Sequence, residues 1–436
     1  MRGELMLDKK FLYQGILKSL KTGTVPDKGY LELLVGREAE LEAFKEEIIY
    51  VSKGGGSTRF IRGDYGSGKT FLAKAVRELA WEENFIVSWV ELGRGVQFNK
   101  LENIYNKIIE GMRTRNYQDI PAFEYILQEW LTRLEEKVRY ENDLNPLDQE
   151  DRKKINRLID QKIEEVLQSV GAYSSSLANA IRGYYRASKE RNNEVKAAAI
   201  GWIKGEKNIP AALKKEFNVK GSIDKENVLS FLNAIIRLIV EIKYSGLLII
   251  IDETELIANI ARRDIRDDAY ENLRRIVDST MNRELSHAFF LFTATESFFD
   301  NEETGVASYQ ALYQRISSLQ KDDFKDLRQP IVSLDGLKRN DLLSLSFKIR
   351  DMHSYLYEWN AAERLGDRYI NEIVERMVKR FGEEVEVNPR DYLRGFVDIL
   401  DWLQQNPEKD VNKWLEKTES IIDELDEEEL GESHVI

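Results

Sequence analysis

The spacing of apolar residues predicts helices along most of the chain and strands in a few short segments. Apolar positions recur at helical spacing in residues 11–20, 38–48, 71–80, 104–112, 155–167, 229–239, 370–378 and 392–403. Short runs rich in Ile, Val, Leu and Phe predict strands in residues 58–62, 85–92, 246–251, 288–292 and 331–334. Helices alternate with these strands, so the pattern predicts an α/β core with a parallel sheet.

A long stretch without clear strands divides this core in two. We therefore expect a large helical insertion inside the core and a helical lid domain after it. The predicted segments are an N-terminal helix and lead-in (1–34), the first part of the core (35–98), the insertion (99–227), the second part of the core (228–335), the lid (336–415) and an acidic tail (416–436).

The strongest motif lies between the first predicted strand and the following helix. Residues 63–70 read Gly-Asp-Tyr-Gly-Ser-Gly-Lys-Thr and match the phosphate-loop pattern G-x-x-x-x-G-K-[ST]. The pattern predicts binding of ATP or GTP, because the glycines let backbone N–H groups face the phosphates while Lys69 neutralises charge and Thr70 offers a hydroxyl to Mg²⁺. The predicted nucleotide-binding residues here are Gly63, Asp64, Tyr65, Gly66, Ser67, Gly68, Lys69, Thr70 and Phe71.

A second motif ends the apolar run at residues 246–251. Asp252 and Glu253 follow it directly, as expected for a buried strand that delivers carboxylates to the ligand-binding edge of a parallel sheet. We expect Asp252 to hold Mg²⁺ and Glu253 to orient or deprotonate the attacking water. The alternative is a core strand that ends in a solvated acidic turn.

Composition narrows the class of protein. The 436 residues predict two or three domains, and the chain has neither an apolar run long enough to span a membrane nor a secretory signal, so a soluble, cytoplasmic protein is expected. It contains no cysteine and only three scattered histidines, which leaves Mg²⁺ with the nucleotide as the expected metal.

The formal net charge of −13 argues against a generally basic surface for nucleic acid. Much of this charge lies in the acidic tail, which is typical of a solvated segment or, less often, a docking peptide. Binding of DNA through a local patch remains an alternative.

The order of the motifs resembles that of the AAA+ ATPases, in the branch with origin-recognition-like proteins. More narrowly, the chain resembles the BrxD-like ATP-binding proteins of the BREX bacteriophage-exclusion systems. The segments that carry the resemblance are Gly-Thr-Val-Pro at 23–26, Val-Gly-Arg-Glu at 35–38, the phosphate loop, Gly-Trp-Ile-Lys-Gly-Glu at 201–206 and Ile-Asp-Glu-Thr-Glu at 251–255.

This resemblance implies further site residues. Gly36 and Arg37 belong to the box before the first strand and are expected near the nucleotide. A polar sensor follows the fourth core strand, where Thr293 is the better candidate and Thr295 the alternative, because neighbouring strand residues face opposite sides. The competing interpretation is a hydroxyl bonded to nearby backbone.

The resemblance also implies two arginines with roles at the phosphates. Arg315 lies where AAA+ proteins carry the arginine that reaches a neighbouring subunit's nucleotide, although a surface salt bridge would also explain it. Arg390 resembles the second sensor, which contacts the nucleotide from the lid, although Arg is also common at helix starts.

Residues 182–220 of the insertion mix many Lys and Arg with Tyr184, Tyr185 and Trp202. Cations and aromatic rings could bind the phosphates and bases of DNA. The favoured interpretation is an amphipathic helical surface with its aromatic residues packed inward.

Together these observations predict a Mg²⁺-dependent ATPase of a phage-defence system, which uses ATP to remodel or position a partner on DNA. The alternatives are a nucleotide-gated switch with little hydrolysis and an origin-recognition-like DNA-binding ATPase. Expected partners are further copies of the chain or other defence proteins, such as helicase-like or methylase components, with double-stranded DNA as an alternative and no membrane.

Overall fold

The computed structural model describes residues 2–317, 326–381, 389–409 and 411. The acidic tail predicted at 416–436 lies outside these residues. The described residues form two compact units. One unit falls within Met1–Ala39, Asp64–Leu72 and Leu334–Ile436, and the other comprises Glu40–Gly63 and Ala73–Ser333.

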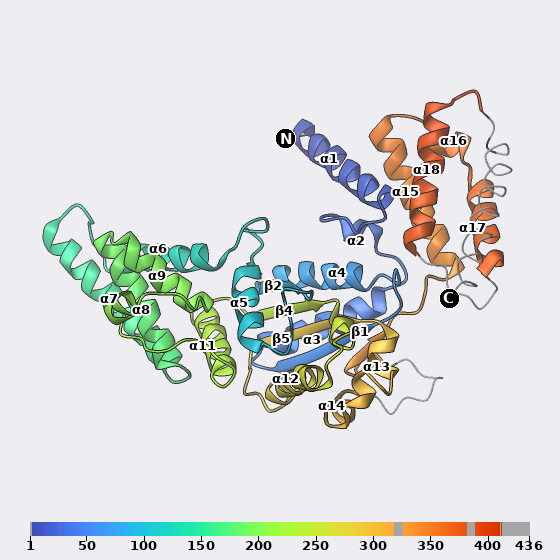
Figure 1. The fold of residues 1–436 in the computed structure, drawn as a ribbon. Helices are drawn as coiled ribbons and strands as arrows, with labels where there is room; N and C mark the ends of the chain where they lie inside the picture. The colour runs from blue at the N-terminus through green and yellow to red at the C-terminus, as the bar shows by residue number, and fades with distance from the viewer. Residues whose placement is uncertain (1, 318–325, 382–388, 410, 412–436) are drawn as a thin grey trace. The chain divides into compact units, whose positions relative to one another are not determined.

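A six-stranded sheet organises the second unit (Figure 1). Its order is β3-β2-β4-β5-β1-β6, and every pairing is parallel except that of β2 with β3. The strands are β1 (Gly56–Arg62), β2 (Ile86–Glu91), β3 (Met112–Arg113), β4 (Leu247–Asp252), β5 (Ala288–Ala294) and β6 (Ile331–Ser333). The predicted α/β fold with a parallel sheet, of the P-loop NTPase class, is confirmed.

The central strands are continuous apolar runs because both faces of the sheet are covered. Every residue of β4 and β5 is buried. Their register aligns Ile251 with Phe292, and that of β1 with β5 aligns Arg62 with Ala294. The carboxyl ends of β1, β4 and β5 therefore meet at one edge of the sheet.

Helices cover the sheet on both faces. In Figure 1, α5 lies beside β2 and α12 lies below the strands; α12 also contacts β1. The helices and 3₁₀ turns of this part are α3 (Glu38–Ser52), α4 (Lys69–Glu82), α5 (Leu101–Gly111), η1 (Thr254–Ile257), α12 (Arg263–Met281), α13 (Glu296–Asp300), η2 (Val306–Ser308) and α14 (Gln310–Ile316).

The stretch between β2 and β4 is almost entirely helical. It contains α5 and then α6 (Phe123–Glu141), α7 (Gln149–Gly171), α8 (Ser175–Glu190), α9 (Asn193–Lys204), α10 (Ala211–Glu216) and α11 (Val228–Glu241). Figure 1 shows α6 to α9 grouped beside the sheet, with α11 next to them. The two-residue strand β3 was not predicted, because two residues are too few to show a strand period.

The Trp-Ile-Lys-Gly-Glu segment is bonded to α5, near the start of the predicted insertion. Gly205 ends α9 in the left-handed region at φ 90°, a conformation that glycine adopts without strain. Trp202 is buried and donates from Nε1 to the carbonyl of Gly221. From α5, the Tyr105 hydroxyl donates to Ile203 O at 2.9 Å and Asn106 Nδ2 donates to Lys204 O at 2.8 Å. This segment therefore has a packing role.

The described residues of the first unit form helices joined by loops. Its helices are α1 (Arg2–Lys21), α2 (Tyr30–Leu33), α15 (Arg339–Tyr357), α16 (Ala361–Arg364), α17 (Asp367–Phe381) and α18 (Pro389–Gln405). Leu17, Ile349 and Leu400 are among the buried residues that pack α1, α15 and α18 into one core. Within the described residues, no helix is long and apolar enough to cross a membrane.

Candidate nucleotide site

The phosphate loop folds back on itself before α4 begins. Gly66 and Gly68 have φ values of 83° and 97°, which side chains other than glycine rarely adopt. The Leu72 N–H donates to Gly68 O at 2.9 Å, so the helix begins within the loop. Lys69 is only 9% exposed, and its Nζ donates to Asp64 O at 3.0 Å. The pattern G-x-x-x-x-G-K-[ST] thus has the compact backbone that phosphate binding requires.

Two features of this loop fit a bound anion. The Ser67 hydroxyl is buried and makes no hydrogen bond with any of the described residues, which is uncommon for a buried polar group. A Cβ atom placed on Gly68 would meet no atom within 4 Å. The loop therefore has a free donor, open space beside its backbone and a lysine charge, which together suit nucleotide phosphates.

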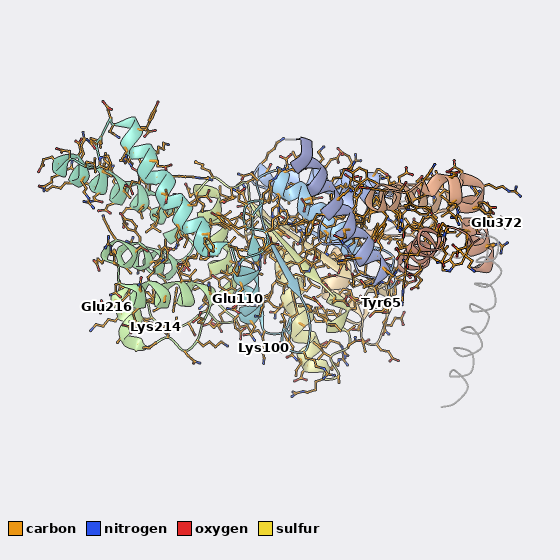
Figure 2. All side chains as sticks on the ribbon, turned by 90° about the horizontal axis from the view of Figure 1, so that it is seen from above. Tyr65, Lys100, Glu110, Lys214, Glu216 and Glu372 are labelled. Carbon is orange, nitrogen blue, oxygen red and sulfur yellow. The ribbon has the colours of Figure 1, made fainter. Side chains whose placement is uncertain are left out.

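Tyr65 lies at the surface of the same loop. Its side chain is 69% exposed and is labelled in Figure 2. The Lys69 ammonium lies 5.4 Å from the centre of its ring, close enough for a cation–π contact.

The acidic motif closes β4 at the carboxyl edge of the sheet. Asp252 is buried at 6% exposure, and its carboxylate accepts a hydrogen bond from the hydroxyl of Thr293 on β5. Of the two candidate sensors, Thr293 is therefore the one that contacts the acidic pair. The Thr295 hydroxyl instead lies 3.0 Å from Ser297 Oγ.

Glu253 has an unusual backbone conformation. Its φ of 59° and ψ of 39° place it in the left-handed region, which is strained for a residue with a side chain. Its N–H lies 3.2 Å from Asp252 Oδ1. Such strain is concentrated at functional sites in proteins, because it persists only where the surroundings enforce it.

The Val-Gly-Arg-Glu box lies against the start of α15. The Arg37 guanidinium donates to the carbonyl of Asp335. Gly36 has φ 67°, and a Cβ there would lie 2.6 Å from Cγ of Asp341. Gly36 thus allows close approach of the Asp341 carboxylate, which also accepts from the Lys338 N–H at 3.1 Å. The sequence did not point to Asp341, because nothing local links it to Gly36.

Arg390 lies in the first turn of α18, beside the Gly-Thr-Val-Pro segment. A Cβ atom on Gly23 would lie 3.4 Å and 3.5 Å from Cγ and Cδ of Arg390. Within the same unit, the ring of Phe71 meets that of Tyr30 edge-on at 6.4 Å. The sequence did not point to Tyr30 either, because its contact partner Phe71 lies far along the chain.

Arg315 belongs to a charge network on α12 and α14. Its Nε donates to Asp278, which also accepts from Arg274 Nη1 at 2.6 Å. Arg274 in turn bonds Glu271, and this hydrogen bond lowers the pKa of the Glu271 carboxyl below its ordinary value. In this conformation Arg315 is held by its own chain.

The family model of the BREX system ATP-binding protein BrxC/D matches residues 9–419. The chain belongs to this family. The resemblance that its motifs suggested is thereby confirmed, and the chain is an ATP-binding protein of a BREX defence system.

Solved structures similar to this BREX family member include two of the ORC2 protein of Aeropyrum pernix. The ADPNP–ADP complexes share 15% identity, with 84% of this chain and 68% of that chain covered and a TM-score of 0.36. The ADP form shares 14% identity, with 84% and 69% covered and a TM-score of 0.35. A search of curated proteins found no match.

The basic stretch of the BREX protein's insertion is mostly engaged in packing. Tyr184 and Trp202 are buried, so their faces are not available for stacking on bases. Its cations form ion pairs that include Arg182–Glu164 (2.6 Å), Lys189–Asp160 (3.0 Å), Lys196–Glu124 (2.9 Å) and Lys207–Glu102 (3.7 Å). Lys214 and Glu216, labelled in Figure 2, carry opposite charges on the same short helix. This pattern favours the inward-packed interpretation over a DNA-stacking surface.

The oxygen donors of the candidate residues suit a hard cation. Asp252 offers a carboxylate and Thr70 a hydroxyl, the ligand types that Mg²⁺ prefers. Among the described residues, no group of three or more His, Cys, Asp or Glu could hold a metal by itself. A cation held by either residue would thus depend on other oxygens, such as those of nucleotide phosphates and water.

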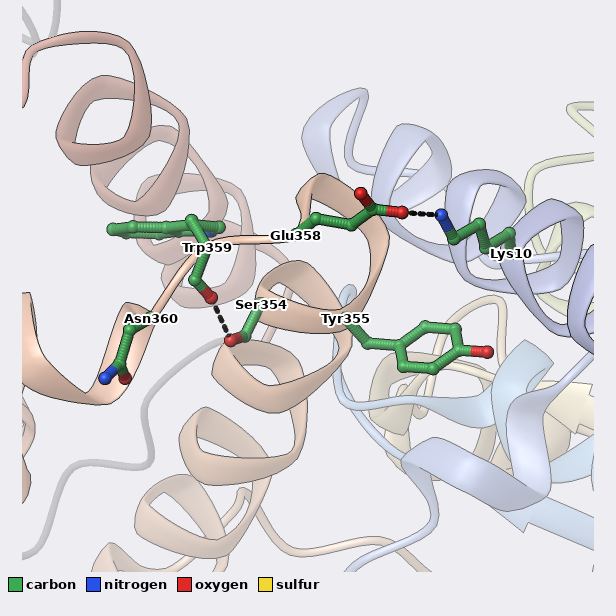
Figure 3. A pocket seen from close by; sticks show the side chains of 6 residues that line it. All are labelled: Lys10, Ser354, Tyr355, Glu358, Trp359 and Asn360. Atoms are coloured by element: carbon green, nitrogen blue, oxygen red, sulfur yellow. Dashed lines mark hydrogen bonds and ion pairs between the residues drawn. The ribbon is translucent and has the colours of Figure 1, made fainter.

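A separate pocket of about 480 Å³ lies between α1 and α15 (Figure 3). It is lined by Lys10, Ser354, Tyr355, Glu358, Trp359 and Asn360. An ion pair from Lys10 to Glu358 links the two helices, and the Ser354 hydroxyl donates to Trp359 O. None of the predicted nucleotide residues lines this pocket.

Proposed function

We propose that this BREX protein is a Mg²⁺-dependent ATPase that cycles between nucleotide states to remodel or position a partner on DNA. The observation that carries the proposal is the acidic edge of β4. There a buried carboxylate on Asp252 accepts from the Thr293 hydroxyl, and Glu253 follows in a strained conformation. A protein that only bound ATP would not need a second, strained carboxylate after the first.

The chemistry assigned to the chain is hydrolysis of the γ-phosphate by water. Lys69 and the loop N–H groups hold the phosphates and neutralise their charge. Thr70 and Asp252 supply oxygens for Mg²⁺, which when bound offsets the negative charge that develops on the transferred group. Glu253 orients the attacking water and accepts its proton, while Thr293 fixes the orientation of the Asp252 carboxylate.

Two arginines complete the proposal. Arg390 contacts the nucleotide from the lid helix α18, and Arg315 reaches the nucleotide of a neighbouring subunit. The second role requires assembly, with further copies of the chain or with other proteins of the defence system. It also requires Arg315 to leave Asp278, so we expect turnover to be slow in the isolated subunit.

Steady-state ATP hydrolysis by the purified full-length chain tests this proposal. Wild type, Lys69→Ala and Glu253→Gln are compared over a series of protein concentrations, with Glu296→Gln as a control for loss of an exposed carboxylate. We expect Lys69→Ala to abolish ATP binding and Glu253→Gln to bind ATP while hydrolysing it at least about 100-fold more slowly. Activity per subunit should rise with concentration.

Wild-type turnover in Glu253→Gln would remove the catalytic role of that residue. The same assay with double-stranded DNA tests the alternative that DNA is contacted directly. Stimulation that is lost on reversing the charge of exposed insertion lysines would support that alternative.

A second candidate function is a nucleotide-gated switch with little hydrolysis. The contact of Arg315 with Asp278 favours it, because an arginine held within its own subunit cannot act on another. Tight ATP binding without turnover at any protein concentration, with or without DNA, would favour the switch over the ATPase.

A further inference from the structure

Glu91 ends β2 directly beside Asp252. The strands β2 and β4 are parallel neighbours in the sheet, and their register pairs Glu91 with Asp252 at the last position of each strand. The pairing continues one residue further, because the Leu92 N–H donates to Asp252 O at 3.1 Å. Paired residues of parallel strands have side chains on the same face, and neighbouring strands lie about 4.8 Å apart. The two carboxylates therefore leave the sheet side by side.

The contacts of β2 identify the face from which they project. Trp89 lies two residues before Glu91 and thus on the same face, and Arg77 Cζ of α4 lies 6.0 Å from the centre of its ring. Ser88 lies on the opposite face, where its hydroxyl donates to Ile108 O of α5 at 2.8 Å. Glu91 is therefore on the α4 face of the sheet. In the chain, α4 is the helix that follows the phosphate loop.

The two carboxylates differ in their surroundings. Asp252 is buried and accepts from the Thr293 hydroxyl. Glu91 is exposed and forms no ion pair with another described residue. Two negative charges on adjacent strands repel each other, so the pair destabilises the folded chain unless a cation offsets it. The arrangement of one fixed and one solvated carboxylate suits a hydrated cation better than it suits the empty fold.

We propose that Glu91 is a positioning residue for the Mg²⁺ of the ATPase, with its carboxylate binding water ligands of the ion that Asp252 holds. Mg²⁺ keeps several of its waters and is usually bound by one or two carboxylates together with substrate phosphates. Acceptors that orient the ligands of a metal typically raise its affinity about 10- to 100-fold. The exposure of Glu91 suits contact through water. The inference rests on the proposed function for the presence of the ion at Asp252.

Binding of Mn²⁺ tests this role without requiring turnover. The free ion is measured by its electron paramagnetic resonance signal, with the full-length chain and a saturating non-hydrolysable ATP analogue. We expect Glu91→Gln to raise the Kd for Mn²⁺ at least about ten-fold, and Glu91→Asp, which keeps the charge, to raise it less. Glu83→Gln is the matched control, because Glu83 is an exposed carboxylate near the opposite end of the same strand, and it should bind Mn²⁺ as wild type does.

Steady-state hydrolysis separates a role at the metal from a role in proton transfer. Glu91→Gln should need at least about ten-fold more Mg²⁺ for half-maximal turnover and should approach the wild-type kcat when Mg²⁺ is saturating. Glu253→Gln should stay slow at every Mg²⁺ concentration. A merely structural role for Glu91 would not move the metal dependence, and thermal unfolding of the metal-free variants should match wild type.

Unchanged Mn²⁺ affinity in Glu91→Gln would overturn the proposal, and so would equal losses in Glu91→Gln and Glu83→Gln. A loss of turnover in Glu91→Gln that saturating Mg²⁺ does not relieve would also contradict it. Weaker Mn²⁺ binding by Glu91→Gln, in a protein whose wild type does not hydrolyse ATP, would support this inference while contradicting the proposed ATPase.

Discussion

The phosphate loop and the basic stretch of the insertion use similar residue types in opposite ways. In the loop, Gly68 has open space beside it and the Ser67 hydroxyl is buried without a partner among the described residues. In the insertion, a Cβ on Gly183 would lie 2.1 Å from that of Phe217, and the cations face carboxylates. Glycine, aromatic and basic residues therefore indicate a ligand site only where the fold leaves their space and hydrogen bonds unfilled.

The largest expected effect is a loss of stability when the packing of the insertion is disrupted. Trp202→Ala should lower the free energy of unfolding by about 3–5 kcal/mol, because it empties a buried site next to Phe231 and removes the bond to Gly221. Denaturant unfolding measures the loss. Lys207→Ala, at an exposed position of the same stretch, should change stability by less than about 0.5 kcal/mol. A Trp202 effect as small as that of the control would mean that the ring is not a core element.

Two glycine substitutions, one in the insertion and one in the phosphate loop, test the difference between these two regions. Gly183→Ala should destabilise the protein, because overpacking against Phe217 costs about 1–3 kcal/mol and outweighs the gain of about 1 kcal/mol in helix propensity. Gly68→Ala costs about 1–3 kcal/mol through backbone strain alone. Only Gly68→Ala should lose ATP binding, which equilibrium binding of a fluorescent ATP analogue would measure. Equal loss of binding in both variants would break the distinction between the two regions.

Thr293→Val tests the hydrogen bond at the acidic edge. The valine retains the shape of threonine but leaves the buried Asp252 carboxylate without this donor, so we expect hydrolysis at saturating ATP to fall about ten-fold, or about 1.4 kcal/mol. ATP affinity should change little. Thr295→Val is the matched control, because its hydroxyl meets Ser297 instead, and it should retain wild-type turnover. The reverse result would assign the sensor role to Thr295.

The smallest expected effect concerns the ion pair of Glu164 with Arg182. The hydrogen bond from Arg182 lowers the pKa of the Glu164 carboxyl below its ordinary value of 4.5. The pair therefore stabilises the fold above that value, and this contribution is lost as pH falls through the lowered pKa. Since Glu164 is half exposed, Glu164→Gln should cost less than about 1 kcal/mol at pH 7.

Unfolding curves of wild type and Glu164→Gln at several pH values would measure this difference. The two proteins should converge in acid. A difference that is constant from pH 7 to pH 3 would show that the effect comes from packing.

The fold was largely predictable because its signals are local. The composition of the run Leu247–Asp252 predicts a buried strand. The phosphate loop is recognised by the fixed spacing of its Gly, Lys and Thr residues. The contacts of Asp341 with Gly36 and of Tyr30 with Phe71 were not predictable, because the residues of each pair are distant in sequence and no local pattern joins them. The alternation of β5 favoured Thr293 over Thr295, but only the strand register links it to Asp252. The roles assigned to Glu253, Arg315 and Arg390 stay predictions.

The left-handed backbone at Glu253 has a consequence for how this protein can evolve. Glycine adopts that conformation freely, so Glu253→Gly would relieve strain while removing the proposed catalytic carboxylate. Random mutagenesis selected only for heat resistance should therefore enrich inactive variants at this codon. Family members that have lost ATP turnover but still require the folded protein should therefore accumulate glycine at this position. The residue at position 253 would then distinguish active members of the family from inactive ones.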